Sequence, residues 1–135
     1  MKTKVKKLLG SFIIITALGF TVFKTQQEDQ LIVGTWVEVD SSFDSRWVFY
    51  ENGICEDYAE NKIFETYNWS IETTSPQCGQ EVKTGGLFSY LKLVNIDDNS
   101  DVYCYEITNL GEEYLALWYL LSGASGITLF KRVED

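Results

Sequence analysis

The chain has 135 residues, of which 15% are aromatic, and its 20 acidic residues outnumber 11 basic ones to give a formal charge of −9. This length allows one domain, and the acidic balance argues against binding to nucleic acid or to anionic membranes. The chain contains no His, so the commonest general base is missing.

The N-terminal segment predicts export. Four lysines within residues 2–7 precede an uncharged apolar run over 8–23, which is the layout of a signal peptide helix, with Ala17-Leu18-Gly19 as a cleavage site. The alternative is an uncleaved membrane anchor, although the run is shorter than the ~20 residues that span a bilayer comfortably. We therefore expect a periplasmic, secreted or cell-surface protein. No Cys follows the run to carry a lipid.

Removing residues 1–23 leaves 7 basic and 20 acidic residues, a formal charge of −13. The polar residues 24–30 predict a flexible leader, and residues 31–135 form the predicted domain. In it, short alternating or apolar runs rich in Val, Ile, Tyr, Phe, Trp and Thr are typical of β-strands. We predict strands over 32–39, 45–50, 54–59, 64–72, 87–95, 102–109, 114–121 and 126–132.

The connections predict how these strands pair. Asn52-Gly53 is a strong hairpin signal, and short turn segments at 97–100, 110–112 and 122–125 join later strands, while 73–86 is the one long loop. Short loops make sequential strands antiparallel neighbours. The sequence thus predicts an all-β fold, an eight-stranded antiparallel up-and-down (meander) β-barrel, since eight strands can close and remove both sheet edges.

Alternation along each strand predicts which side chains face inward. On the predicted strands over 45–50 and 64–72, the inward sets are Trp47 with Phe49, and Tyr67 with Trp69 and Ile71. The strand over 87–95 places Leu87, Ser89, Leu91 and Leu93 on one face, whereas the strand over 114–121 is apolar on both.

Several of these segments, in this order, resemble a known family. They are Gly34-x-Trp36, Asn52-Gly53, Tyr67-x-Trp69-x-Ile71, Leu115-x-Leu117 and Phe130-x-Arg132. Over residues 31–133 the chain resembles the small exported lipocalin-like proteins of bacteria, within the lipocalin or calycin group. The resemblance implies a barrel that holds a small, mostly apolar molecule. It also implies a structural contact between Trp36, which follows Gly34, and Arg132. The chain departs from the family in its missing C-terminal helix and middle motif, so a narrower, side-chain-filled barrel fits equally well.

Two functions follow as hypotheses. In the first, a small apolar or amphipathic ligand binds in the barrel interior, lined by Trp47, Phe49, Tyr67, Trp69, Leu91 and Leu117. In the second, side chains fill the interior, and the protein binds a protein or glycan through a surface aromatic patch of Tyr103, Tyr105, Tyr114 and Trp118. The sequence leaves the oligomeric state open.

Neither catalysis nor a cofactor has support in the sequence. No nucleophile elbow, phosphate loop or dinucleotide motif is present, and Asp97-x-Asn99-x-Asp101 lacks the Gly and distal Glu of a calcium loop. The three cysteines allow one disulfide in three ways. We favour Cys78–Cys104, because the loop that holds Cys78 is free to reach the strand that holds Cys104; zinc is disfavoured without His or a C-x-x-C pair. We therefore expect a non-enzymatic protein without a metal.

Overall fold

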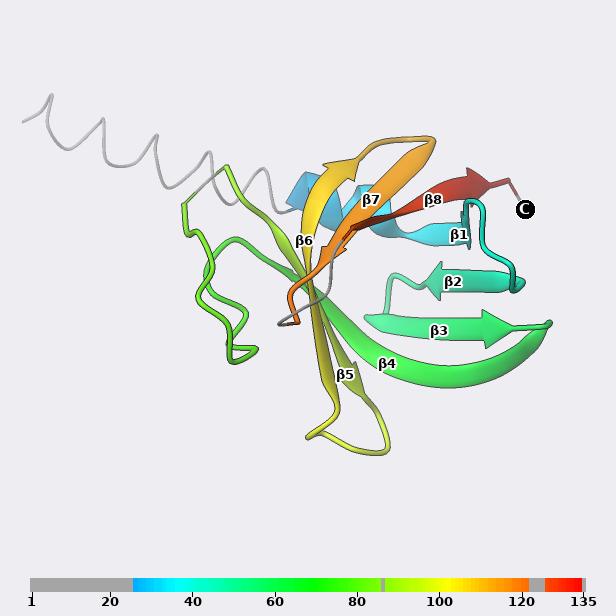
Figure 1. Cartoon of the computed structure of the whole chain (residues 1–135), viewed down its shortest axis with the longest axis horizontal. Coiled ribbons are helices and arrows are strands. Elements are labelled where there is room, and N and C mark those ends of the chain that lie inside the picture. Colours follow the sequence, from blue (N-terminus) through cyan, green and yellow to red (C-terminus); the bar gives the residue numbers. More distant parts are fainter. Residues whose placement is uncertain (1–25, 86, 122–125, 135) are drawn as a thin grey trace, which may run out of the picture.

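The computed structural model describes residues 26–85, 87–121 and 126–134. It is an all-β protein whose strands form one closed antiparallel barrel in the order β1 to β8, which confirms the predicted fold class (Figure 1). The strands are β1 Gly34–Glu38, β2 Ser45–Phe49, β3 Ile54–Ala59, β4 Lys62–Glu72, β5 Tyr90–Asn95, β6 Val102–Leu110, β7 Tyr114–Tyr119 and β8 Ile127–Val133.

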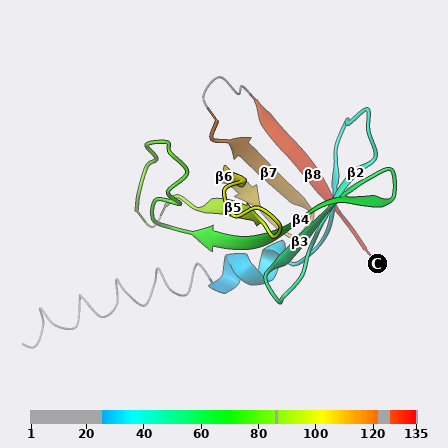
Figure 2. The same ribbon diagram turned by 90° about the horizontal axis from the view of Figure 1, so that it is seen from below.

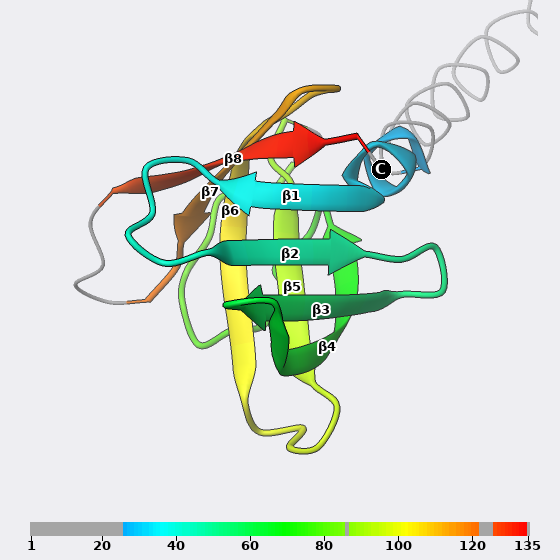
Figure 3. The same cartoon turned by 90° about the vertical axis from the view of Figure 1, so that its right-hand side faces the viewer.

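The barrel closes between its first and last strands. Each strand pairs with the next one along the chain, and β1 also pairs with β8, in a register that places Trp36 opposite Arg132. Figure 3 shows β8, β1, β2 and β3 side by side. Because every strand has two partners, the sheet has no free edge.

A short helix over residues 26–32 precedes β1, where we expected a flexible leader over 24–30 and a strand from residue 32. Figure 2 shows the helix in blue, and Figure 3 shows β1 directly after it. Its last residue, Ile32, is fully buried. This helix is held by the barrel rather than by its own sequence, because so short a helix is unstable alone. The predicted signal peptide over 1–23 lies outside the described residues, as does the turn over 122–125.

Two other strands begin at least two residues away from the predicted position. The β3–β4 hairpin turns at Glu60 and Asn61, which have φ values of 51° and 63°, as a tight hairpin turn requires; β4 therefore begins at Lys62 rather than residue 64. At the other strand, β5 begins at Tyr90 rather than residue 87. Leu87 lies in the preceding loop and is 88% exposed, so the prediction that it shares a strand face with Leu91 was wrong.

The long loop between β4 and β5, green at the left of Figure 1, is fixed to the barrel wall. Cys78 in the loop forms a disulfide with Cys104 on β6, as predicted. The Tyr90 hydroxyl donates a hydrogen bond to the Lys83 carbonyl. Tyr90 and Cys104 are both buried. None of the helices in the described ranges has the length and hydropathy that a bilayer-spanning helix needs.

Candidate functional site

One end of the barrel is closed by the helix and by the two residues that the lipocalin resemblance singles out. The guanidinium of Arg132 stacks over the Trp36 ring, 4.2 Å from its centre. The Trp36 indole N–H donates to the Ile32 carbonyl at 2.7 Å, and Arg132 donates to the carbonyls of Leu31 and Val33. The carbonyls that end a helix lack partners within it, so these side chains cap the helix. We call this the closed end.

Gly34 makes that stacking possible. Its φ is 135°, and a Cβ built there would lie 2.4 Å from the Nη1 atom of Arg132. A side chain at this position would therefore collide with the guanidinium. The three predicted signature residues come together in a structural role.

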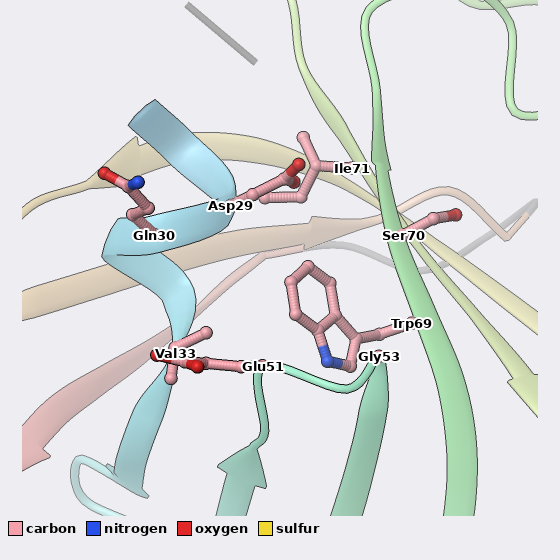
Figure 4. A pocket seen from close by; sticks show the side chains of 8 residues that line it. All are labelled: Asp29, Gln30, Val33, Glu51, Gly53, Trp69, Ser70 and Ile71. Carbon is pink, nitrogen blue, oxygen red and sulfur yellow. The ribbon is translucent and has the colours of Figure 1, made fainter. Parts of the chain in front are cut away.

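A groove of about 540 Å³ lies beside the closed end, between the helix and the β2–β3 turn (Figure 4). Its apolar floor is Trp69, and Asp29 and Glu51 lie at its edges. The Trp69 indole N–H is already used, because it donates to the Tyr50 carbonyl at 3.0 Å. Burial, with the nearby charge of Glu28, raises the pKa of Asp29 above its usual range. The groove is open and offers an indole face with no free indole donor.

The interior next to the closed end is packed with side chains. Of the predicted ligand residues, Phe49 is 1% exposed and Leu91 and Leu117 are fully buried. These three belong to the hydrophobic core, and so do Trp47 and Tyr67, while Trp69 packs against it. Trp69 lies at the groove described above, on the closed-end side of the barrel. Trp47 and Tyr67 are the predicted ligand residues nearest the opposite end.

Rings from facing walls of the barrel meet at Trp47. The centre of its ring lies 5.7 Å from that of Tyr105 and 5.0 Å from that of Phe130. Because β2 and β6 stand four strands apart in a ring of eight, the contact between Trp47 and Tyr105 spans the barrel. A ligand could not pass this layer without moving the rings.

Above that layer, at the end away from the helix, the inward positions carry tyrosines and acids. We call this end the mouth. Tyr67, Tyr103, Tyr105 and Tyr119 form a chain of ring contacts with centres 5.0–6.1 Å apart. Asn95, which is 6% exposed, donates to the Glu65 carboxylate at 2.8 Å. The sequence analysis did not identify Glu65 or Tyr119 as site residues.

Two groups at the mouth have strongly perturbed ionisation. Burial, with the charges of Glu65 and Glu38, raises the pKa of Asp57 to about 6, although a hydrogen bond from the Trp47 side chain acts against this rise. Burial, followed by the proximity of Tyr103 and Asp57, raises the pKa of Tyr67 well above its usual range. Both raised pKa values have the same cause: the Asp57 carboxyl and the Tyr67 phenol are partly shielded from water and lie close to other acidic groups.

The Tyr67 side chain is 7% exposed. Its hydroxyl is not among the buried side-chain atoms that lack a hydrogen-bond partner, since within the described residues the atom in that state is Nε of Arg46.

The four residues of the predicted surface patch do not lie on one face of the sheet: two point into the barrel and two point outward. Tyr103 and Tyr105 pack against the core, so their part of the patch prediction was wrong. Tyr114 and Trp118 are 39% and 46% exposed. They lie on the outer face of β7, and β8 contributes further exposed apolar side chains there, namely Ile127, Leu129 and Val133.

The third cysteine, Cys55, is a buried free thiol. Burial, followed by the charges of Asp57 and Glu56, raises its pKa well above the usual value. A thiol in this state is inert. In the described part of the chain, no group of three or more His, Cys, Asp or Glu side chains is arranged to hold a metal ion.

Comparisons with known proteins find no match. No family model, no curated protein and no solved structure matches this chain. The functional argument therefore depends on the geometry described above.

Proposed function

We propose that this protein is an exported, non-enzymatic, lipocalin-like binding protein that holds a small amphipathic molecule at the mouth of its barrel. The Trp36–Arg132 stack at the closed end is the contact that the family resemblance implies. Export is supported by the N-terminal sequence pattern and by the disulfide between Cys78 and Cys104, since disulfides persist in oxidising compartments.

The observation that carries this proposal is the chain of tyrosine rings at the mouth, whose centres lie 5.0–6.1 Å apart: Tyr67, Tyr103, Tyr119 and Tyr105. Ligand sites in proteins are largely apolar and contain a few converging polar groups. The phenol rings at the mouth provide the apolar walls, and the Tyr67 hydroxyl and the carboxylates provide polar groups. The helix-side groove has weaker support, because its indole donor is already bonded within the protein.

The Trp47–Tyr105 contact limits how far the ligand enters. Because these rings meet across the barrel, the ligand occupies the space on the mouth side of them. Leu91 and Leu117 lie in the packed core and support the site without touching the ligand. We thus place a shallow site where the family resemblance implied a deep cup.

The test uses Trp fluorescence in two double variants. W69F/W118F keeps Trp47 at the mouth, and W47F/W69F keeps Trp118 on the outer face; both keep the buried Trp36. Small amphipathic probes of neutral, cationic and anionic character are titrated into each. A saturable change confined to the variant that keeps Trp47 supports the mouth site. No response to any probe, together with no co-purified molecule in native mass spectrometry, would rule it out.

A second function, the interaction module, is favoured by one observation. Trp118, Ile127 and Leu129 are 46%, 60% and 38% exposed on adjoining strands, and contiguous exposed apolar surface marks interaction sites. The same two variants separate this function from the first. Addition of soluble glycans or a protein ligand would change the fluorescence of only the variant that keeps Trp118.

A further inference from the structure

One side-chain nitrogen on the barrel wall is buried without a hydrogen-bond partner. Among the described residues this atom is Nε of Arg46, on β2. The guanidinium forms no ion pair within the described ranges, and it stacks on the Tyr58 ring with Cζ 4.5 Å from the ring centre. Buried polar groups are normally hydrogen-bonded, and an exception needs an explanation such as a partner from outside the chain.

The Arg46 side chain lines a groove of about 440 Å³ on the outer wall of the barrel. Neighbouring residues of a strand point to opposite faces, and Trp47, the next residue, packs in the core. The groove has an apolar floor of Val37 on β1, Val48 on β2 and Val133 on β8, strands that lie side by side in Figure 3. It is therefore separate from the mouth, which lies inside the barrel.

Positive charge lies on both sides of the groove floor. Val37 on β1 is opposite Arg46 on β2 and opposite Lys131 on β8, and residues directly opposite each other share a face of the sheet. Neighbouring strands are about 4.8 Å apart, so the two basic residues stand roughly 10 Å apart across β1. In a chain with a formal charge of −9, this row is a local exception.

The carboxylates of this face do not neutralise Arg46. Glu56 shares the face, but its Oε2 atom accepts hydrogen bonds from the hydroxyls of Tyr50 at 2.8 Å and Tyr58 at 2.7 Å. The hydrogen bond with Glu56 is the main reason why the pKa of Tyr50 is raised to about 12. Asp44 lies at the edge of the groove and forms no ion pair with Arg46 in the part of the chain that the structure describes. The guanidinium thus remains available to an external acceptor.

The chemistry of the groove indicates which acceptor fits. A guanidinium presents its N–H donors in a planar fork that matches a carboxylate. The stacking contact with Tyr58 already holds the plane of the guanidinium, so less conformational freedom is lost on binding. The charges of Asp44 and Glu56 oppose a second negative charge nearby, which favours a monoanion over a phosphate dianion. The valine side chains suit an apolar tail.

We propose that this outer groove binds an organic monocarboxylate with an apolar tail. The carboxylate lies against the guanidinium of Arg46, and the tail lies over Val37 and Val48. A small rotation of the guanidinium within its own plane keeps the contact with Tyr58 and turns the Nε–H toward the groove, so that the ligand provides the missing acceptor. This site is additional to the ligand site at the mouth and does not depend on it.

The test uses ¹H–¹⁵N correlation spectra of the labelled protein at pH 6.5, where carboxylate probes are ionised. 3-Phenylpropanoate and 3-phenylpropanamide share a skeleton and differ in charge, and hexanoate and hexanamide repeat the comparison with a flexible tail. We expect saturable shifts of the Arg46 Nε–H and of the Val37 and Val48 amides. Each carboxylate should bind at least about tenfold more tightly than its amide, since charge-assisted hydrogen bonds are the stronger kind.

Variants of the groove should change the affinity in opposite directions. R46Q removes the charge and should abolish the preference for carboxylates. R46K keeps the charge but loses the fork, so it should bind several-fold more weakly than the wild-type protein; it also replaces R46Q if that variant does not fold. E56Q removes a nearby negative charge and should strengthen carboxylate binding about twofold.

K92Q is the matched control, because it loses the same charge as R46Q at another place on the outer wall. Lys92 on β5 lies opposite Cys104 on β6, three strands away from β2 in the order of the barrel. It should leave the affinity for both carboxylates unchanged. The spectrum of each variant without probe shows whether it is folded.

The possible outcomes separate the groove from the mouth. If the amides bind as tightly as the carboxylates, or if phenyl phosphate binds more tightly than 3-phenylpropanoate, the monocarboxylate assignment is wrong. If carboxylates shift the Trp47 and Tyr67 signals and R46Q does not weaken them, they bind at the mouth; the inference is then wrong and the proposed function gains support. If no probe shifts the Arg46 signal up to its solubility limit, the inference is overturned, and the proposed function still rests on its own fluorescence test.

Discussion

Arg132 and Trp36 form the joint between the barrel and its N-terminal helix: the guanidinium lies 4.2 Å from the centre of the indole ring. Both side chains also donate hydrogen bonds to carbonyls at the end of the helix, and Arg132 donates in addition to the Glu112 carbonyl at 2.6 Å. One guanidinium thus links the helix, β1, β8 and the β6–β7 turn.

Arg132→Met should lower the free energy of unfolding by about 2–4 kcal/mol, because it removes a cation–π contact and several hydrogen bonds to carbonyls. Urea denaturation measures this. Lys131→Met is the control, since Lys131 is exposed and should change stability little. Equal effects of the two variants would contradict the capping role.

Gly34→Ala should destabilise the protein by about 1–3 kcal/mol, through the unfavourable φ and the collision with Arg132. Gly126→Ala provides the comparison: Gly126 has a φ of 111°, but a Cβ there meets nothing within 4 Å. The excess cost at Gly34 over Gly126, measured by chemical denaturation, reports the collision. An excess of zero would show that Arg132 moves aside freely.

Removing the disulfide with C78S/C104S should cost about 3.5 kcal/mol, the chain-entropy value for a closed segment of this length. The cysteines are 26 positions apart. Peptide mapping under non-reducing conditions verifies the pairing, and denaturation with and without reductant measures the cost. Reductant should destabilise the wild-type protein and leave the double variant unaffected.

Cys55 should resist thiol reagents in the folded protein. Its side chain is fully buried, and burial raises its pKa, so little thiolate forms at neutral pH. Iodoacetamide labelling followed by mass spectrometry should find Cys55 unmodified in buffer and modified in denaturant. Rapid labelling in buffer would mean that the β2–β3–β4 wall opens locally.

Asp57→Asn should stabilise the protein at pH 7.5. The pKa of Asp57 is raised from 3.8 to about 6, so the folded state disfavours the ionised carboxylate. The resulting penalty is absent below pH 4, grows between pH 4 and 6, and is complete above the folded pKa. Because the group is partly exposed, solvent screening reduces the expected gain to about 1 kcal/mol.

Urea denaturation of Asp57→Asn at pH 7.5 and pH 4 measures this difference. Glu106→Gln at both pH values corrects for the loss of one negative charge. We expect the gain at pH 7.5 to disappear at pH 4. A gain of the same size at both values would mean that packing, and not ionisation, causes it.

Much of the barrel could be predicted because its signals are local. The Asn52-Gly53 hairpin and the alternation of Tyr67, Trp69 and Ile71 depend on neighbouring residues alone. The helix over 26–32 could not be predicted, since its stability comes from carbonyl partners that lie far along the chain. The Glu60–Asn61 turn was missed because neither residue is glycine, although both adopt a positive φ.

The mouth was harder to predict than the core. Glu38, Asp57 and Glu65 each look like an ordinary polar residue near a strand end. The two-residue alternation along each strand could have identified them as inward-facing, because each lies two residues from an inward side chain, namely Trp36, Cys55 and Tyr67 respectively. In β6 the burial of side chains does not distinguish the two faces, because Cys104 on the outer face is also buried, under the long loop.

The pairing of β1 with β8 has a consequence for the order of events during biosynthesis. The hydrogen bond from Arg132 to Val33 joins positions 99 residues apart, and such distant contacts form slowly. A nascent chain that lacks β8 leaves one edge of β1 and one edge of β7 unpaired. Completion of the native barrel therefore waits until β8 has left the ribosome.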